Sequence, residues 1–410
     1  MDVCEMMGEH LGLVPPWKAT EFWSEPNARG ELDDHLRVEV PPGSCMPCPQ
    51  CGRMCRIHDR TPERAWRSLD VVSRRLYIHA RIPRTDCPDC GVRRADVPWA
   101  RPHSHFTLSM ESMIMAMCRE MAVSAAAALI HEDANRIWRL VRHSARKLVE
   151  GMDLSHVTAV GVDEKCFSGH DAFVTVFADI VRHRVLFVTP GKGSGAVGEF
   201  RDFLTEHGGR AANIADFTCD FGAAYVSGIG RYFKRARITF DRFHLVKLAN
   251  DAMNDVNFGK MKLAVNRMKV KYMMVRNSGS LTDGEKELRD RICEDNEELG
   301  HAYRLKESLV SVYSMGDADI ARDHLLGWVS WAGRSGFRPF ARLAKTVEAN
   351  IEGILRWFST GMSNALLEGT NSLISLIKRR ARGFKRVENL IAVCYLTGAR
   401  GKVDLYGAPR

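Results

Sequence analysis

Val160-Gly-Val-Asp-Glu164 completes a short apolar run that starts at Val157 and has the composition of a buried strand. A second run of this kind leads to Asp220, in the segment Phe217-Thr-Cys-Asp-Phe221. An ionised carboxylate at the end of a buried strand is costly unless a cation or a hydrogen-bond donor pairs with it. Asp163 and Asp220 are therefore candidate ligands of a metal ion.

A third carboxylate lies far away in the sequence, on a segment with helical periodicity. It is Glu368, in Ser363-Asn-Ala-Leu-Leu-Glu-Gly-Thr-Asn371. One face of the predicted helix is polar and the opposite face is rich in leucine and isoleucine. We therefore expect the polar face to lie against a polar site. The polar positions are Asn364, Glu368, Asn371 and Ser375.

Two carboxylates at strand ends and a third on a helix suit a pair of hard divalent ions, which prefer oxygen ligands and keep positions open for a phosphate. We therefore expect two Mg²⁺ (or Mn²⁺) ions at Asp163, Asp220 and Glu368, and chemistry on phosphodiesters. In the alternative interpretation the two aspartates are turn residues and Glu368 is a solvated helix residue.

The composition favours a polyanionic partner and argues against a secreted or membrane-spanning protein. Lysine and arginine number 59 against 50 acidic residues, a formal net charge of +9. An excess of this size suits nucleic acid, although it is also compatible with a merely basic surface. No apolar stretch of about 18 residues occurs, and the start of the chain is not that of a signal peptide. We expect a soluble protein without a membrane partner.

Two Cys-x-x-Cys knuckles, each followed by glycine, predict a zinc ribbon. They lie at 48–52 and 87–91, and the segment between them, 66–83, has the pattern of a hairpin. Each tight turn presents two thiolates, so one tetrahedral structural Zn²⁺ can join the turns. The 35 intervening residues exceed the usual spacing, Cys45 and Cys55 could replace ligands, and a redox dithiol is the main alternative. The predicted ligands are Cys48, Cys51, Cys87 and Cys90.

Residues 108–150 have the pattern of three helices with a tight break before the third, which predicts a helix-turn-helix. We expect helices at 108–120 and 124–130 and a third from Ala134. In a major groove the arginines of the third helix could contact base edges and phosphates. An amphipathic helix with a solvated basic face is the alternative. The arginines predicted to bind DNA are Arg136, Arg139, Arg142 and Arg146.

The pattern changes to short strands after residue 157. Three successive strands are followed by alternating helices and strands, which predicts an α+β fold with several domains. The predicted strands are 157–162, 172–180, 184–188, 214–219 and 236–240, and the helices between the last of them are 196–206 and 223–233.

Four segments together resemble the DDE transposases of bacterial insertion sequences, specifically the ISL-three type. The resemblance extends from the cysteine pairs to about Ala399. The segments are Val160-Gly-Val-Asp-Glu164, Thr239-Phe-Asp-Arg-Phe-His-Leu-Val-Lys-Leu248, Ile354-Leu-Arg-Trp-Phe358 and Asn364-Ala-Leu-Leu-Glu-Gly-Thr-Asn-Ser-Leu-Ile374.

The resemblance implies a catalytic core with a ribonuclease-H-like mixed sheet, interrupted by an all-helical insertion. In that layout the first and fourth strands are neighbours, which would bring Asp163 and Asp220 within reach of shared ions. The expected domains are 1–40 without a clear role, 41–100 zinc-binding, 104–152 helix-turn-helix, 155–247 first part of the core, 248–359 insertion, 360–400 second part of the core, and 401–410 tail.

For function, the resemblance implies a transposase that binds the ends of its element, cuts them and joins them to target DNA. Asp163, Asp220 and Glu368 would be catalytic, and Asp241 and His244 secondary, either supporting the site or contacting DNA. A homodimer or larger assembly would pair two ends, in the bacterial cytoplasm and in association with the nucleoid.

Further DNA contacts are expected after Glu368, where a densely basic run suits tracking of phosphates beside the cut strand. The tryptophans of the predicted insertion could stack on an extruded base, or could be buried in its core. The basic residues are Lys378, Arg379, Arg380, Arg382, Lys385 and Arg386, and the tryptophans are Trp328, Trp331 and Trp357.

Two alternatives to a transposase remain open from the sequence. One is a ribonuclease-H-like nuclease that cuts without strand transfer, which the carboxylates alone do not exclude. The other is a DNA-binding regulator whose catalytic site is vestigial.

Overall fold

The computed structural model describes residues 2–168, 172–256, 267–276, 278–362, 365–381 and 383–398, with the side chains at 168, 267, 365–368, 370, 371, 373 and 398 left out. The chain divides into two compact units, and the boundary between His143 and Ser144 falls inside helix α4. None of the described helices has the length and apolar character that crossing a membrane requires.

The N-terminal residues, which had no predicted role, contribute two strands to a four-stranded sheet with its own core. The sheet order is β1-β2-β6-β5, in which β1 and β2 form a hairpin and β6 pairs parallel with β2. Its buried residues include Trp17, Leu36, Trp66 and Ile78. The elements are α1 (Val3–His10), β1 (Lys18–Pro26), β2 (Leu32–Glu39), β5 (Arg64–Arg67) and β6 (Leu76–Ala80).

A second four-stranded sheet, with the order β3-β4-β7-β8, consists of two hairpins whose turns carry the Cys-x-x-Cys knuckles. The hairpin predicted between the knuckles exists as β5 and β6, but it belongs to the first sheet. The knuckles are unusually far apart in the sequence because the segment between them adds two strands to the neighbouring sheet. The strands are β3 (Cys45–Pro47), β4 (Met54–Arg60), β7 (Pro83–Cys87) and β8 (Gly91–Arg94).

The three helices predicted for the helix-turn-helix are present as α2 (Leu108–Glu120), α3 (Val123–Leu129) and α4 (Ala134–Glu150). Thr107 caps α2, because its hydroxyl accepts the N–H of Met110 at 3.3 Å. The Asp133 carboxylate does the same for α4, accepting the N–H groups of Asn135 and Arg136 at 3.0 and 3.1 Å. Both caps satisfy donors that the first helical turn leaves without a partner.

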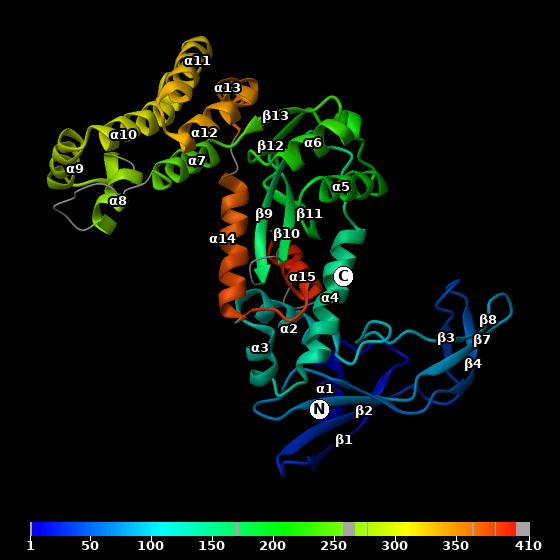
Figure 1. Cartoon of the computed structure of the whole chain (residues 1–410). Coiled ribbons are helices and arrows are strands. Elements are labelled where there is room, and N and C mark those ends of the chain that lie inside the picture. Colours follow the sequence, from blue (N-terminus) through cyan, green and yellow to red (C-terminus); the bar gives the residue numbers. More distant parts are fainter. Residues whose placement is uncertain are drawn as a thin grey trace. The chain divides into compact units, whose positions relative to one another are not determined.

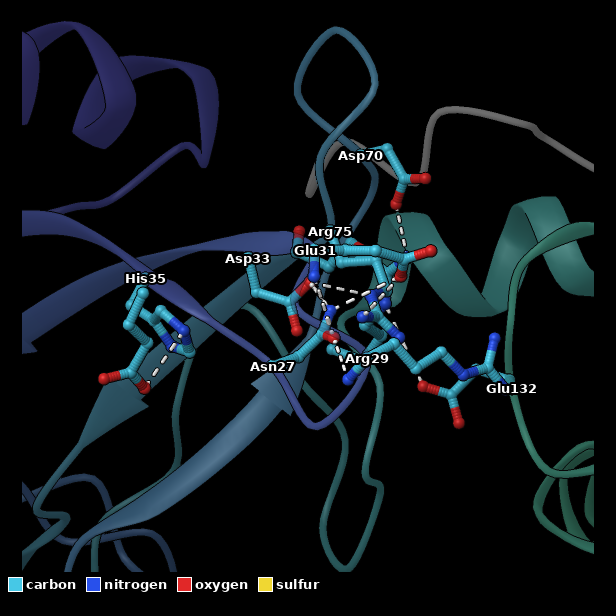
Figure 2. Close-up of polar contacts among 11 residues, drawn as sticks. Asn27, Arg29, Glu31, Asp33, His35, Asp70, Arg75 and Glu132 are labelled. Atoms are coloured by element: carbon cyan, nitrogen blue, oxygen red, sulfur yellow. Dashed lines mark hydrogen bonds and ion pairs between the residues drawn. The ribbon is translucent and has the colours of Figure 1, made fainter.

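A polar network ties the turn between α3 and α4 to the first sheet (Figure 2). Arg67 of β5 is buried, pairs with Asp70, and lies 3.9 Å from the carboxylate of Glu132 in that turn. Glu132 also pairs with Arg136 at 3.4 Å. A buried charge is tolerated only when it is paired, so this network holds the turn before α4 in a defined position on the sheet. In the same figure, Arg75 donates to Asp33 at 2.8 Å beside the β1–β2 turn.

The larger unit is built on a five-stranded sheet with the order β11-β10-β9-β12-β13 (Figure 1). The first three strands are antiparallel, whereas β12 pairs parallel with both β9 and β13. The first and fourth strands are therefore neighbours, as predicted. The strands are β9 (Ala159–Ser168), β10 (Ala172–Asp179), β11 (Arg184–Pro190), β12 (Asp216–Cys219) and β13 (Arg237–Phe240).

One predicted boundary is wrong: β9 does not end at Val162 but continues to Ser168. The polar residues after Val162 remain in the strand because β10 pairs with them, Val176 opposite Asp163 and Thr175 opposite Glu164. The parallel partner β12, by contrast, pairs no further along β9 than Gly161. Asp163 thus lies inside β9 but just beyond the stretch that β12 covers.

Different helices cover the two faces of this sheet. Val160, Val162 and Phe217 belong to a buried cluster that includes residues of α5 (Ser194–Glu206) and α6 (Ala223–Tyr232). On the other face, α14 (Ala365–Arg380) packs against β9 and β10, and α15 (Val387–Gly398) packs against β11. Two hydrogen bonds fix these helices: Lys378 Nζ donates to Cys166 O at 2.6 Å, and Val188 N–H donates to the Tyr395 hydroxyl at 3.1 Å.

Between β13 and α14 the regular elements of the described residues are all helices. The buried cluster of the sheet continues into them, through Leu245 and Ile354 to Leu305 and Trp328. Gly353 allows α13 to approach β13, because a Cβ there would lie 2.5 Å from the Phe240 ring. The helices are α7 (Arg242–Asn254), α8 (Arg267–Val275), α9 (Asp283–Asp295), α10 (Glu297–Val310), α11 (Ala318–Arg334), α12 (Arg338–Ala349) and α13 (Ile351–Thr360), with short 3-10 turns at Ser278–Ser280 and Ser311–Ser314.

Candidate active site and zinc site

Asp163 and Asp220 lie on neighbouring strands and on the same face of the sheet. Side chains alternate along a strand, and Val162 and Cys219 belong to the buried cluster on the face of α5 and α6. The residues that follow them, Asp163 and Asp220, therefore belong to the face that α14 covers. Both are partly buried at the end of the sheet where the parallel strands finish.

Asp241 joins this pair from the next strand along the sheet. Its backbone N–H donates to Cys219 O at 3.1 Å, which extends the pairing of β12 with β13 by one step. Thr218 and Thr239 are partners in that pairing, so Asp241, two residues after Thr239, falls on the same face as Asp220. The carboxylates of Asp163, Asp220 and Asp241 thus lie on one face of the sheet, at the ends of adjacent strands.

His244, in the first turn of α7, completes the cluster. One ring nitrogen, Nδ1, lies 3.0 Å from Oδ2 of the buried Asp241. Burial lowers the pKa of His244, but the hydrogen bond to Asp241 and the negative charges of Asp163 and Asp220 outweigh it and raise that pKa above its ordinary value. The imidazole is therefore biased toward its protonated form, which has a proton to donate.

The Asp163 carboxyl is in an environment that disfavours its own charge. Burial raises its pKa, and the carboxylates of Asp220 and Asp241 raise it further. The N–H of Glu164, 2.8 Å from Oδ1, and the His244 charge offset only part of this effect. A cation bound among these oxygens would relieve the repulsion, so the arrangement fits oxygen-seeking metal ions.

The turn after Asp220 orients its carboxylate. The N–H of Gly222 donates to Asp220 Oδ1 at 2.9 Å. Space there is tight, because a Cβ on Gly222 would lie 2.8 Å from the same oxygen and 3.3 Å from the Tyr225 ring. Glycine at this position thus leaves the carboxylate room to hold its orientation.

Gly222→Ala should therefore displace the Asp220 carboxylate and slow catalysis on the order of 100-fold, the cost of a misplacement of about 1 Å in a reacting group. The fold should survive, since φ at Gly222 is −67°, a value that alanine adopts readily. Gly230→Ala in α6 is the matched control, because no atom lies within 4 Å of its Cβ position. Rates of the DNA cutting that the sequence predicts, and melting temperatures of both variants, test this. Equal rates for the two would contradict the proposed role of the turn.

Sequence reasoning missed a hydrogen-bonded group on the other side of β9. The Tyr225 hydroxyl in α6 lies 3.0 Å from Thr175 Oγ1 and donates to Glu164 Oε2 at 3.3 Å. Burial raises the pKa of Tyr225, so the phenol stays protonated and can donate. Glu164 follows Asp163 directly, and the Tyr225 contact holds this part of β9 against α6. The sequence carries no signal for it, because the partners are 61 residues apart.

For Glu368 the structure describes only the helix that carries it. The residue lies in α14, the helix that packs against β9 and β10, while its side chain and that of Asn371 are outside the described part of the chain, as is Asn364 altogether. The structure therefore brings Asp163 and Asp220 together with the two secondary residues, Asp241 and His244, and leaves the position of the third predicted carboxylate untested.

The residues predicted to contact DNA differ in exposure. On α4, Arg142 is partly buried, whereas Arg136, Arg139 and Arg146 are exposed. Lys378 donates to the Cys166 carbonyl, so its ammonium group already has a structural partner. Arg382 lies outside the described residues, and the exposed members of the basic run are Arg379, Arg380, Lys385 and Arg386.

The three tryptophans are engaged within the protein. The buried Trp328 donates its indole N–H to Leu305 O at 2.8 Å, and Trp331 donates to His301 Nε2 at 3.0 Å. Trp357 packs edge-on against Tyr313, with ring centroids 5.1 Å apart. The packing alternative for these side chains is thus the one that the structure favours.

The two knuckles come together as a four-cysteine cluster. The sulfur atoms of Cys48, Cys51, Cys87 and Cys90 all lie within 4.8 Å of one another. Gly52 and Gly91 have positive φ values of 75° and 71°, which the tight turns require and which glycine adopts at low cost. A set of four thiols this close suits one tetrahedral Zn²⁺ ion better than a two-cysteine redox pair.

Local groups favour the thiolate form that zinc requires at one of the four cysteines, Cys87, whereas the pKa values of Cys51 and Cys90 are raised and a bound cation would have to lower them. Burial raises the pKa of Cys87, but the backbone N–H groups of Asp89 and Cys90 outweigh it and lower that pKa to about 6. The alternative ligands are placed differently: Cys45 is exposed, and the Cys55 thiol faces Arg53 O at 3.3 Å. Neither belongs to the cluster of four.

Comparison with known families gives three consecutive matches. Residues 45–90 match the zinc finger of the transposases of IS204, IS1001, IS1096 and IS1165, and residues 95–145 match the helix-turn-helix domain of transposase family ISL3. Residues 160–394, more than half of the chain, match the transposase domain of the same ISL3 type. A zinc ribbon and a helix-turn-helix thus precede the transposase domain, as predicted.

Characterised proteins similar to this chain are transposases as well. The transposase for insertion sequence element IS1557 of Mycobacterium tuberculosis, in strains CDC 1551 / Oshkosh and ATCC 25618 / H37Rv, is 28% identical over 392 residues, which cover 88% of this chain and 87% of the relative. The transposase for IS1001 of Bordetella parapertussis is 25% identical over 358 residues, 85% of this chain and 87% of the relative. Because the match to the ISL3 transposase domain covers more than half of the chain, the chain belongs to the ISL3 family of transposases.

Proposed function

We propose that this transposase cuts and joins DNA with Asp163, Asp220 and Glu368 as the ligands of two divalent metal ions. The observation that carries the proposal is the convergence of Asp163 and Asp220 on one face of the sheet, at the end where α14 packs. The raised pKa of Asp163 supports a cation at this place. The zinc ribbon is proposed to hold its structural Zn²⁺ through Cys48, Cys51, Cys87 and Cys90.

A ribonuclease-H-like core is the proposed framework. In its support, three antiparallel strands are followed by two parallel strands that place the fourth beside the first. The residues from 248 to 359, helical wherever they are described, are then an insertion between β13 and the helix of Glu368. The buried cluster that continues from the sheet into these helices would hold the insertion firmly on the core.

Helix geometry supports Glu368 as the third ligand. It lies ten residues before Lys378, which corresponds to about 15 Å along α14. Lys378 bonds to Cys166, and α14 runs beside β9 in the same direction (Figure 1). A distance of about 15 Å along a strand is between four and five residues, which leads back from Cys166 to about Val162. The backbone of Glu368 is thus expected level with Asp163.

The residues present fit Mg²⁺ (or Mn²⁺), since carboxylate oxygens are the ligands these ions prefer. When bound, the ions supply Lewis-acid activation of the attacking oxygen and neutralise the charge of the leaving oxygen. The protein orients Asp163 through the Glu164 N–H and Asp220 through the Gly222 N–H. His244, held by Asp241, can donate a proton to the leaving oxygen or orient a ligand.

DNA contacts are proposed on both units. Arg136, Arg139, Arg142 and Arg146 on α4 would recognise the ends of the element, and the basic run after Glu368 would track phosphates beside the cut strand. Because transposition joins two ends to one target, we propose that a dimer or larger assembly performs it.

A gel assay with labelled element ends, target DNA and Mg²⁺ tests the proposal. Cutting followed by joining to the target is the expected result. Cutting alone would indicate the nuclease alternative, and binding without cutting would indicate a regulator with a vestigial site. Omission of the divalent ion should abolish both steps and leave end binding in place, because the arginines of α4 need no metal.

A further inference from the structure

Phe243 is an exposed aromatic side chain at the rim of the carboxylate cluster. It lies between Asp241 and His244, and its ring meets the His244 ring edge-on at 5.9 Å between centroids. Despite this position 55% of Phe243 is exposed to solvent. A large apolar ring in water beside a polar cluster gains free energy when a flat apolar partner covers it.

The groups around Phe243 suit a nucleic acid as that partner. Arg242 precedes it and is exposed, with its guanidinium 5.7 Å from the centre of the Trp357 ring, and Lys247 lies one helical turn after Phe243 on the same exposed side of α7. Two cations flanking an aromatic ring can hold the phosphates on either side of a base that stacks on the ring. On the inner side of the same helical turn, Asp241 and His244 are directed to the carboxylates.

Other aromatic side chains of the described residues are less suited to this role. The three tryptophans between β13 and α14 are packed against protein groups. Tyr272 on α8 is similarly exposed, at 53%, but the Arg276 guanidinium lies over its ring at 5.1 Å. Exposure and nearness to the carboxylates therefore coincide at Phe243.

We propose that Phe243 stacks on the unpaired base next to the scissile phosphate and so fixes the DNA strand in the active site. The inference rests on the proposed function, because it assumes cutting at Asp163 and Asp220. It assigns Phe243 as a residue that binds substrate, not one that transfers a proton or holds metal.

A double-mutant cycle between ring and base tests the proposal. Phe243→Ala and Phe243→Leu are combined with element-end duplexes in which the nucleotide on either side of the scissile phosphate is abasic. Each change alone should slow cleavage on the order of 10-fold, as loss of one base–aromatic contact does. At one of the two positions the combined change should slow cleavage no more than either change alone. Phe243→Tyr should keep the wild-type rate, because its ring stacks equally well.

Tyr272→Ala is the matched control, since it removes an aromatic ring of similar exposure in the same unit. The fold-loss in cleavage rate caused by Tyr272→Ala should multiply with the fold-loss caused by each abasic nucleotide, because the two changes act independently. Melting temperatures show whether the variants fold. If Phe243→Ala does not fold, Phe243→Leu still tests the ring, because leucine keeps most of the apolar volume. If wild type cuts the ends but the effects of Phe243→Leu and base loss multiply at both positions, the stacking role is wrong. If the wild-type protein does not cut the ends, the proposed function is wrong, and the inference about Phe243 is wrong as well.

Discussion

Asp163→Asn should slow the cutting of element ends by about 1,000-fold, which corresponds to about 4 kcal/mol of lost transition-state stabilisation. Asparagine has nearly the same shape but no charge, so the site loses affinity for divalent ions while its packing is kept. Rates measured under single-turnover conditions with saturating Mg²⁺ report this loss directly.

The same substitution should leave the fold intact and can raise the melting temperature. Burial and neighbouring carboxylates raise the pKa of Asp163 in the folded chain. An acid with a raised pKa contributes stability only while it is protonated, and this contribution is lost as the pH rises through the folded-state pKa. At neutral pH without metal the charged Asp163 therefore costs stability, and Asn removes that cost. Reduced end binding or unfolding in this variant would contradict the assignment.

Asp216→Asn provides a matched control on the neighbouring strand. Asp216 lies at the start of β12, where it pairs with Arg356 at 2.5 Å, away from the end of the strand that carries Asp220. Its loss should weaken an ion pair and leave the cutting rate within a few fold of wild type. A loss as large as that of Asp163→Asn would mean that the assay reports folding, not catalysis.

Glu368→Gln should match Asp163→Asn in its effect, and Asp241→Asn decides between two possible third ligands. Asp241 is buried at the same face as Asp220 and is bonded to His244. If Asp241 only supports the site, its replacement should lower the cutting rate by about 10- to 100-fold. If Asp241→Asn abolished cutting while Glu368→Gln cut normally, the metal ligands would be Asp163, Asp220 and Asp241.

Helix boundaries could be predicted from the sequence where local signals agree. The helices predicted at 108–120 and from Ala134 begin at these residues as α2 and α4, and in the structure Thr107 and Asp133 cap them. The parallel strands could be predicted because they are buried on both faces and therefore read as continuous apolar runs. Asp163 and Asp220 stood out as charges that directly follow such runs.

Features that depend on distant partners could not be predicted in this way. The extension of β9 through Glu164 and Lys165 results from pairing with β10, which tolerates polar residues that a single sequence assigns to a turn. Residues 1–40 gain a role only through the parallel pairing of β2 with β6. Lys378 was predicted to track phosphate as one charge in a basic run, and its partner is a carbonyl 212 residues away.

Removal of zinc should unfold the ribbon sheet while the neighbouring sheet and the helix-turn-helix stay folded. The ribbon's own buried cluster consists of cysteines, Cys48, Cys55 and Cys87 with Cys90 against them, whereas Met46 of β3 and Ile57 of β4 pack into the core of the first sheet. The cysteine end of the sheet therefore depends on its metal, and structural zinc contributes about 10 kcal/mol or more to folding in such modules. The first sheet has its own apolar core and holds the turn before α4 through Arg67 and Glu132.

Cys87→Ser and chelation of zinc should therefore have the same local result. Zinc content should fall from one ion per chain to none, and limited proteolysis should open 45–60 and 83–94 while 64–80 stays protected. Cys45→Ser is the matched control, because this exposed cysteine lies in the same hairpin but outside the cluster. It should keep its zinc and its resistance to protease. If Cys87→Ser also exposed 64–80, the two sheets would fold as one cooperative unit and the ribbon would not be a separate zinc-dependent element.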